Sequence, residues 1–183
     1  ADAIAIDNQS GPLLLAGDTL LFHDRAGLGI GEVSLSALGL SALEPPLAFD
    51  STGALLASGQ LVTDNVDTEG DNASQLLRCD LQQSKCQPFS PQFSGSIRAL
   101  VVHPLDGSVL LADNGQLVKL NRDGVVEARA EVALPDHPLL RLHAGLLFVN
   151  SPQGPGISVY RYEDNAFGQQ LDEILLLPPA ALQ

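Results

Sequence analysis

Apolar residues along the chain occur in short runs that end at a polar residue and a turn, and this arrangement repeats four times. Each unit has a first apolar run that ends in Asp or His, a turn that contains Gly, and a second apolar run. Short apolar runs bounded by Gly and Pro predict buried β-strands. The paired runs are residues 3–7 with 12–16, 46–50 with 54–57, 100–103 with 108–113, and 140–143 with 146–150.

Two further strands are predicted after each pair, and in these polar and apolar residues alternate. Alternation is typical of strands with one face in solvent, so the outer half of each unit is expected to be more exposed. The pattern predicts an all-β chain with helix nearly absent, residues 35–43 being the one ambiguous stretch. It gives four units of about four antiparallel strands, over residues 1–40, 41–94, 95–135 and 136–178.

The period of the units predicts the architecture. The residues that end the first runs recur at intervals of 43, 53 and 40 residues, and they are Asp7, Asp50, His103 and His143. The longest interval contains a polar, acidic insertion at residues 63–74. A period near forty residues with four strands per repeat is typical of β-propeller blades. Residues 1–183 are therefore expected to form a single β-propeller-like domain.

Composition and charge narrow the set of partners. Lys and Arg number 9 and Asp and Glu number 22, which gives a net charge of −13. This charge repels phosphate backbones and anionic lipids, so nucleic acid is not an expected partner. No apolar run has the length of a membrane-spanning helix. The chain contains no Met and begins at Ala1, which favours a processed chain or an excised domain and leaves open a removed leader or anchor.

Cys79 and Cys86 are the two cysteines, and the polar residues 82–85 between them predict a turn. If the flanking runs are antiparallel neighbours, the two side chains face each other and can form a disulfide. Two inert thiols are the alternative, whereas a metal site is disfavoured because one Cys pair lacks further ligands. A disulfide predicts a periplasmic or secreted protein.

The third unit resembles a known repeat. Residues 100–113, followed by residues 116–124, are similar to the NHL-type repeat of β-propellers, whose broader relatives are the SMP-30 (gluconolactonase-like) and low-density-lipoprotein-receptor-type propellers. The resemblance implies a ring of six or more blades. Three arrangements stay open: a part of a larger propeller, two chains in an eight-bladed ring, or four blades that close alone. An open set of blades leaves apolar faces and strand edges exposed, which predicts a partner surface.

Two sets of residues are candidates for a metal site. The strand-end residues Asp7, Asp50, His103 and His143 occupy equivalent positions and can converge on one ion, but Asp and His also open turns. The insertion offers oxygen ligands for calcium at Asp64, Asp67, Glu69 and Asp71. Their spacing differs from the Asp-x-Asp-x-Asp-Gly calcium loop, so a solvated loop is the alternative. No other cofactor is expected.

The resemblance to lactonases implies a divalent metal held by acidic and Asn side chains in a central channel. Asp113 and Asn150, which end second strands, are the nearest candidates, although a matching Glu is not evident. The sequence contains no nucleophile elbow, phosphate loop or zinc-protease motif. Tyr160 and Tyr162 share one face of a strand and are predicted to pack, with a small recognition patch as the alternative.

These observations favour an extracytoplasmic propeller module that binds or scaffolds protein, through a protein partner or through self-association at blade edges. One alternative is a divalent-metal-dependent hydrolase of the lactonase type. Another is the sensor domain of a membrane-anchored protein. An enzyme is the less favoured of these interpretations.

Overall fold

The chain forms four antiparallel sheets of four strands each. The computed structural model describes residues 3–7, 11–62 and 74–175. The strands of the first sheet are β1 (Ala3–Asp7), β2 (Gly11–Ala16), β3 (Thr19–His23) and β4 (Gly29–Ser34). Those of the second sheet are β5 (Leu40–Phe49), β6 (Leu55–Leu61), β7 (Ser74–Asp80) and β8 (Lys85–Phe93). The remaining eight strands form the third and fourth sheets.

The third and fourth sheets repeat this order of strands. The third sheet contains β9 (Ile97–Val102), β10 (Val109–Asp113), β11 (Gln116–Leu120) and β12 (Val126–Glu131). The fourth contains β13 (Leu140–His143), β14 (Leu146–Asn150), β15 (Gly156–Arg161) and β16 (Gln170–Leu175). Within every sheet the strands lie side by side in chain order. The predicted all-β class, with four units of four antiparallel strands, is confirmed.

Helix is confined to two short 3-10 turns in the described part of the chain, η1 (Ser36–Leu38) and η2 (Asp164–Ala166). The ambiguous stretch 35–43 divides at Gly39, whose left-handed φ of 72° ends η1, and β5 begins at the next residue. Gly tolerates this conformation because it has no Cβ. None of the described helices is long and apolar enough to cross a membrane.

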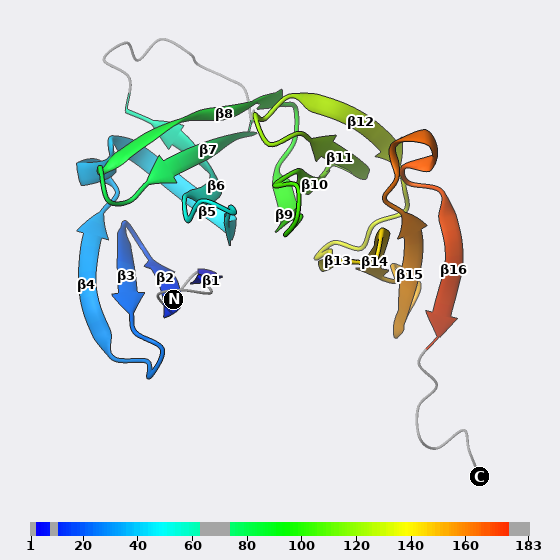
Figure 1. The fold of residues 1–183 in the computed structure, drawn as a ribbon, viewed down its shortest axis with the longest axis horizontal. Coiled ribbons are helices and arrows are strands. Elements are labelled where there is room, and N and C mark those ends of the chain that lie inside the picture. Colours follow the sequence, from blue (N-terminus) through cyan, green and yellow to red (C-terminus); the bar gives the residue numbers. More distant parts are fainter. Residues whose placement is uncertain (1–2, 8–10, 63–73, 176–183) are drawn as a thin grey trace.

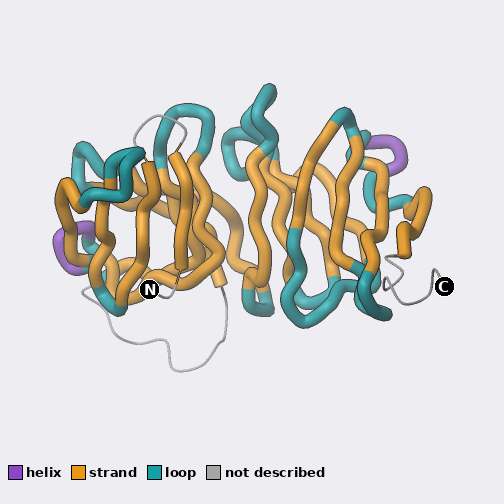
Figure 2. The backbone as a smooth tube through the Cα atoms, turned by 90° about the horizontal axis from the view of Figure 1, so that it is seen from below, coloured by secondary structure: helices purple, strands orange, loops and turns teal. Residues whose placement is uncertain are grey.

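The four sheets stand around a common centre as an open arc (Figure 1). The first strands β1, β5, β9 and β13 lie toward the centre, and the last strands β4, β8, β12 and β16 lie at the periphery. The first and fourth sheets form the two ends of the arc. Seen from the side, the strands stand next to one another and the turns gather along two edges (Figure 2). We call the edge formed by the turns 50–54, 81–84, 103–108 and 121–125 the Asp50 edge.

The core consists of three layers, each lying between two adjacent sheets. Neighbouring residues in one strand serve different layers, because their side chains point to opposite faces. Leu55 packs toward the first sheet and Leu56 toward the third, while Leu111 packs toward the second and Leu110 toward the fourth. All four are fully buried, and each contributes about 1.5–3 kcal/mol of burial free energy. The second and third sheets are therefore packed on both faces.

The first and fourth sheets are packed on one face only. In the first sheet the register places Ile4, Leu14 and Leu21 side by side on the face away from the second sheet. Ile4, Ile6 and Ile30 of this sheet are 59%, 70% and 63% exposed. In the fourth sheet, all residues of β16 are exposed. The last strand of each sheet is more exposed than the second strand: in the third sheet, β10 is fully buried, whereas β12 alternates between half-buried and exposed residues, as predicted.

Candidate functional site

The structure separates the residues that were candidates for metal sites. Asp64, Asp67, Glu69 and Asp71 lie outside the described residues, so the calcium loop stays a prediction. The side chain of Asp7 is also outside them. Asp50, His103 and His143 belong to three different sheets, and among the described side chains no three His, Cys, Asp or Glu residues are grouped closely enough to hold a metal ion.

Asp50 organises the turn that follows β5. Its Oδ1 accepts hydrogen bonds from the backbone amides of Thr52 and Ala54, at 2.8 and 3.0 Å, and from the Thr52 hydroxyl. Its Oδ2 accepts a hydrogen bond from Nε of Arg78 at 2.7 Å. Partial burial acts to raise the pKa of Asp50, but the bonds from Thr52, Arg78 and Ala54 outweigh it and lower the pKa below the ordinary value. The residue is thus a charged turn anchor.

Arg78 was not singled out by the sequence analysis. It lies on β7, and Nη2 donates a second hydrogen bond, to the Thr52 hydroxyl at 2.8 Å. One sequence feature could have pointed to Arg78: it is a single cation within the apolar run 76–79, where an unpaired charge would be unusual. Its partner is 28 residues earlier in the chain, and only the register of the strands brings the two together.

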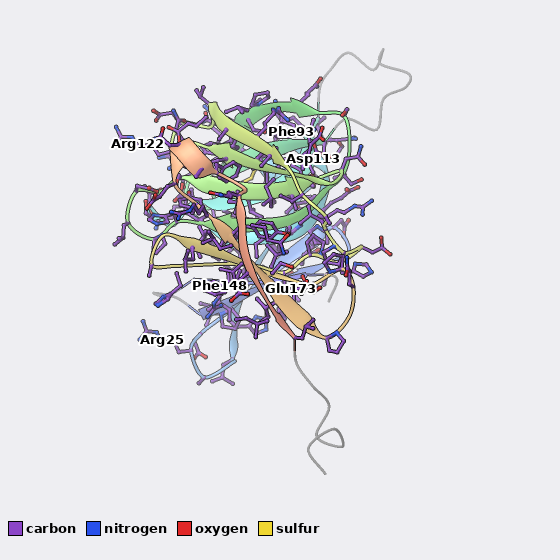
Figure 3. All side chains as sticks on the ribbon, turned by 90° about the vertical axis from the view of Figure 1, so that its right-hand side faces the viewer. Arg25, Phe93, Asp113, Arg122, Phe148 and Glu173 are labelled. Carbon is purple, nitrogen blue, oxygen red and sulfur yellow. A yellow bond between two sulfur atoms is a disulfide. The ribbon has the colours of Figure 1, made fainter. Side chains whose placement is uncertain are left out.

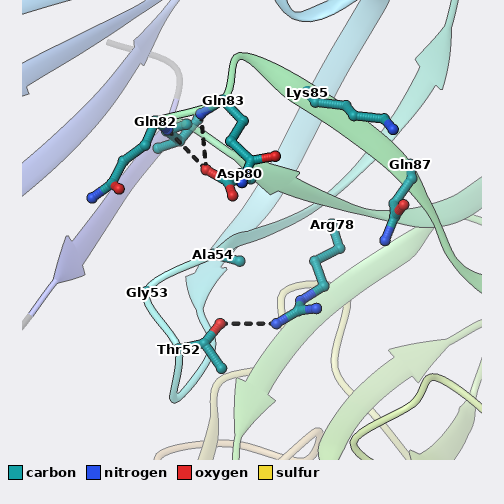
Figure 4. A pocket seen from close by; sticks show the side chains of 10 residues that line it. Thr52, Gly53, Ala54, Arg78, Asp80, Gln82, Gln83, Lys85 and Gln87 are labelled. Atoms are coloured by element: carbon teal, nitrogen blue, oxygen red, sulfur yellow. Dashed lines mark hydrogen bonds between the residues drawn. The ribbon is translucent and has the colours of Figure 1, made fainter.

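A hollow opens at the Asp50 edge beside Arg78 (Figure 4). Its polar half has a volume of about 320 Å³ and lies between the turn 52–54 and the hairpin of β7 and β8. The side chains around it are mostly polar, and they include Thr52, Arg78, Asp80, Gln82, Gln83, Lys85 and Gln87. The Asp80 carboxylate is hydrogen-bonded within its own turn, because Oδ1 accepts hydrogen bonds from the backbone amides of Gln82 and Gln83.

The hollow continues into a second half of about 410 Å³ between the first and second sheets. We call it the apolar half for its aromatic and aliphatic side chains, although His23, Asp50 and Gln82 also line it. Thr52, Gly53, Leu81 and Gln82 belong to both halves. Its apolar lining includes Phe22, Phe49 and the exposed side chains of Ile6 and Ile30. A groove that is built on turns and combines polar groups with aromatic and aliphatic side chains is typical of a binding site.

His103 lies in a second polar cluster at the same edge, between the third and fourth sheets. Its ring stacks on that of Tyr162, with centroids 5.3 Å apart and planes 4° from parallel. The hydroxyls of Tyr162 and Ser108 share a hydrogen bond, Ser108 also donates to Asp106, and Nζ of Lys119 lies 4.8 Å from the centre of the Tyr162 ring. The cluster joins two sheets, and His103 opens the turn 103–108.

The pKa values of the two acids in this cluster, Tyr162 and Asp106, shift in opposite directions. Burial raises the pKa of Tyr162, and the hydrogen bond with Ser108 only partly offsets this. Burial also acts to raise the pKa of Asp106, but the bonds from the Ser108 hydroxyl and amide outweigh it and lower that pKa. Tyr160 and Tyr162 are both buried in the layer between the third and fourth sheets. The packing interpretation of these tyrosines therefore agrees with the structure.

Asp113 and Asn150 end the second strands of neighbouring sheets but have different surroundings. Asn150 accepts a hydrogen bond from the backbone amide of Leu139 and donates one to the carbonyl of His137. Asp113 is 4% exposed, and its Oδ1 has no hydrogen-bond partner among the described residues. It lines a small pocket with Phe93 and Arg129. Figure 3 labels Asp113 and Phe93 in this region. Burial raises the pKa of Asp113, an effect that the charge of Arg129 opposes.

The predicted disulfide between Cys79 and Cys86 is confirmed. The two residues are directly opposite each other in the ladder of β7 and β8. Both are buried, in the layer between the first and second sheets. The disulfide therefore fixes the hairpin whose tip, residues 81–83, forms one wall of the hollow.

Comparisons with known proteins find similar folds but no similar sequences. A scan against protein-family models and a search of curated proteins find no match. Solved propeller structures superpose on nearly the whole chain. The periplasmic gluconolactonase PpgL of Pseudomonas aeruginosa has a TM-score of 0.61 at 14% identity, covering 97% of this chain and 58% of its own. The Dos1 propeller has a TM-score of 0.58 at 15% identity, covering 96% of this chain and 48% of its own.

A third similar structure is that of a nidogen/laminin complex, with a TM-score of 0.59 at 12% identity, covering 94% of this chain and 62% of the matched one. Identities at this level show the fold alone. The chain spans only 48% to 62% of the length of these three solved chains. These comparisons, together with the four sheets, show that the fold is that of a β-propeller.

Proposed function

We propose that this chain is a propeller module that acts outside the cytosol by associating with other protein. The observation that carries the proposal is the apolar row on the outer face of the first sheet, where Ile4, Leu14 and Leu21 are neighbours in register. Ile4 is 59% exposed, and Leu14 and Leu21 are half-buried. Large aliphatic side chains in such a group cost free energy in water, and grouped exposure of this kind is typical of a protein-interaction surface. Ile6 and Ile30 of the same sheet line the hollow.

Two further findings support the proposal. The arc of sheets is open, so its end faces and end strands are available to a partner or to a second copy of the chain (Figure 1). The disulfide of Cys79 and Cys86 favours a periplasmic or secreted location. Membership of the NHL-type or SMP-30-like propellers is part of the same proposal and rests on the residues of the third unit.

Site-specific photo-crosslinking in cells of the natural source tests this function. A photoreactive phenylalanine analogue replaces Ile4 in one variant and Leu139 in another, since Leu139 is similarly exposed, at 72%, but lies in the link between the third and fourth sheets. We expect a discrete protein adduct from position 4 and none from position 139. Adducts from neither position, or equally from both, would overturn the proposal.

Lactone hydrolysis separates this function from the lactonase alternative. Asn150 uses both ends of its carboxamide in backbone hydrogen bonds, which leaves it poorly placed to bind a metal. We expect no hydrolysis of aldonolactones above background with added calcium, zinc or manganese. A rate that depends on one of these metals and is lost in Asn150→Ala would favour the lactonase instead.

A further inference from the structure

The polar half of the hollow is rich in carboxamides. The side chains of Gln82, Gln83 and Gln87 line it and have no hydrogen-bond partner within the described part of the chain. Each carboxamide offers two N–H donors and one carbonyl acceptor. These are the same groups that a peptide backbone presents, so the three side chains can pair with both the N–H and the C=O groups of an extended chain.

The charges beside these carboxamides are largely compensated. Arg78 is paired with Asp50, and Asp80 accepts hydrogen bonds from two backbone amides. Lys85 stands directly opposite Asp80 in the ladder of β7 and β8, so the four charges sum to zero, although no ion pair joins these two within the described residues. A site with compensated charges does not select a strongly ionic ligand. It is better suited to neutral polar groups, such as those of a peptide backbone.

The apolar half lies next to the carboxamides and shares Leu81 and Gln82 with the polar half. Phe22, Phe49 and Ile30 line a space of about 410 Å³, which is large enough to bury an aliphatic side chain. A ligand that crosses from one half to the other must therefore present an apolar side chain and a polar backbone within a short length.

We propose that this hollow binds an extended segment of a partner protein, with one aliphatic side chain in the apolar half and its backbone on Gln82, Gln83 and Gln87. The inference rests on the proposed protein-binding function and names the chemistry of the partner. A second copy of the chain is disfavoured as the occupant, because each copy carries a net charge of −13 and two copies repel.

Selection of peptides on the purified chain tests the inference. A phage-displayed library of random linear peptides is selected on the immobilised chain, and the enriched peptides are synthesised with a fluorophore for anisotropy titration. We expect the enriched peptides to share an aliphatic residue. Ile30→Ser and Gln82→Ala should each weaken their binding by about tenfold, the typical effect of losing one well-placed contact.

Matched variants elsewhere on the surface provide the control. Leu139→Ser and Gln153→Ala remove an exposed aliphatic side chain and an exposed carboxamide outside the hollow, and we expect both to bind the peptides normally. Unchanged circular dichroism and urea midpoints show that each variant is folded. Failure to enrich any peptide, or equal loss in the control variants, would overturn the inference. So would dimerisation of the purified chain that Ile30→Ser and Gln82→Ala abolish, because a second copy would then be the occupant. If photo-crosslinking at position 4 gives a protein adduct but no peptide binds, this inference is wrong and the proposed function is still supported.

Discussion

Nε of Arg78 lies 2.7 Å from Oδ2 of Asp50, and this ion pair joins the third strand of the second sheet to the turn after its first strand. The carboxylate is 10% exposed, so it depends on this partner for much of its solvation. The pair also forms part of the hollow, since Arg78 lines the polar half and Asp50 lines the other half. Stability and binding therefore depend on the same side chains.

Replacing Arg78 by Gln is expected to destabilise the fold by about 2 kcal/mol, because a mostly buried carboxylate loses its charged hydrogen bond. Urea unfolding at neutral pH measures this loss. The folded state lowers the pKa of Asp50, so its contribution is present above the unfolded pKa and is lost as the pH falls through the folded pKa. The difference between wild type and variant should therefore shrink in acid.

Arg161 gives a control for this experiment. It lies 3.9 Å from Glu163 and is 44% exposed, as expected of a weak surface pair. Arg161→Gln should change the free energy of unfolding by no more than about 0.5 kcal/mol. Equal losses in the two variants would show that the contact between Arg78 and Asp50 has no special role.

Asp113 ends β10 and Asn150 ends β14, the second strands of two neighbouring sheets. Replacing the Asp by Asn and the Asn by Asp tests their different surroundings. Asp113→Asn removes a buried charge with an unpartnered oxygen, so we expect the free energy of unfolding to rise by about 1 kcal/mol at neutral pH. Folding raises the pKa of Asp113, which means that its charge opposes folding above that pKa and ceases to do so in acid. The gain should therefore disappear as the pH is lowered.

The reverse substitution, Asn150→Asp, should destabilise the protein. It replaces the amide that donates to the carbonyl of His137 and brings a negative charge next to that oxygen. We expect a loss of about 1–3 kcal/mol, measured by the same urea unfolding. If both exchanges were neutral, the different hydrogen bonding of these two residues would have no energetic consequence.

Gly124 and Gly115 both have a φ of 82°, but only one of them is crowded. A Cβ at Gly124 would overlap the backbone carbonyl oxygen of Phe89, whereas a Cβ at Gly115 meets nothing within 4 Å. Gly115→Ala should cost about 1 kcal/mol for the left-handed conformation alone. Gly124→Ala should cost at least about 2 kcal/mol more, because β8 and the turn 121–125 must separate. Thermal unfolding of the two variants measures the difference.

The disulfide should stabilise the second sheet. The loop it closes is short, with a sequence separation of 7, and the chain-entropy estimate for such a loop is about 2–3 kcal/mol. Reduction should lower the urea midpoint of the wild type and leave a Cys79→Ala, Cys86→Ala double variant unaffected. Intact mass before and after reduction checks the bond itself. Equal masses would contradict both the bond and the proposed location.

The sequence predicted those features that depend on local pattern. The strand pairs with their Gly turns were found because only a short turn separates the two strands of each pair, and the Cys79–Cys86 bond because the two residues flank one turn. The contact of Asp50 with Arg78 and that of Ser108 with Tyr162 were not found. They join residues 28 and 54 positions apart, and their geometry depends on strand register and on how adjacent sheets pack.

Sequence patterns could not predict the hollow either. Its glutamines resemble any exposed polar residues in the sequence, and its apolar half is formed by side chains from two different sheets. Ile6 and Ile30 look like ordinary strand residues, because periodicity shows which face a residue occupies and not whether another sheet covers that face. Only the arrangement of the sheets shows that this face is open.

The strand order of the sheets has a consequence for how the protein is made. Because each strand pairs with the strand that precedes or follows it in the chain, a blade can complete its hydrogen-bond ladder within about fifty residues of synthesis or export. Each new blade then meets a finished apolar wall on the blade before it. Assembly of the four blades can therefore proceed in chain order, each blade packing on the one before it.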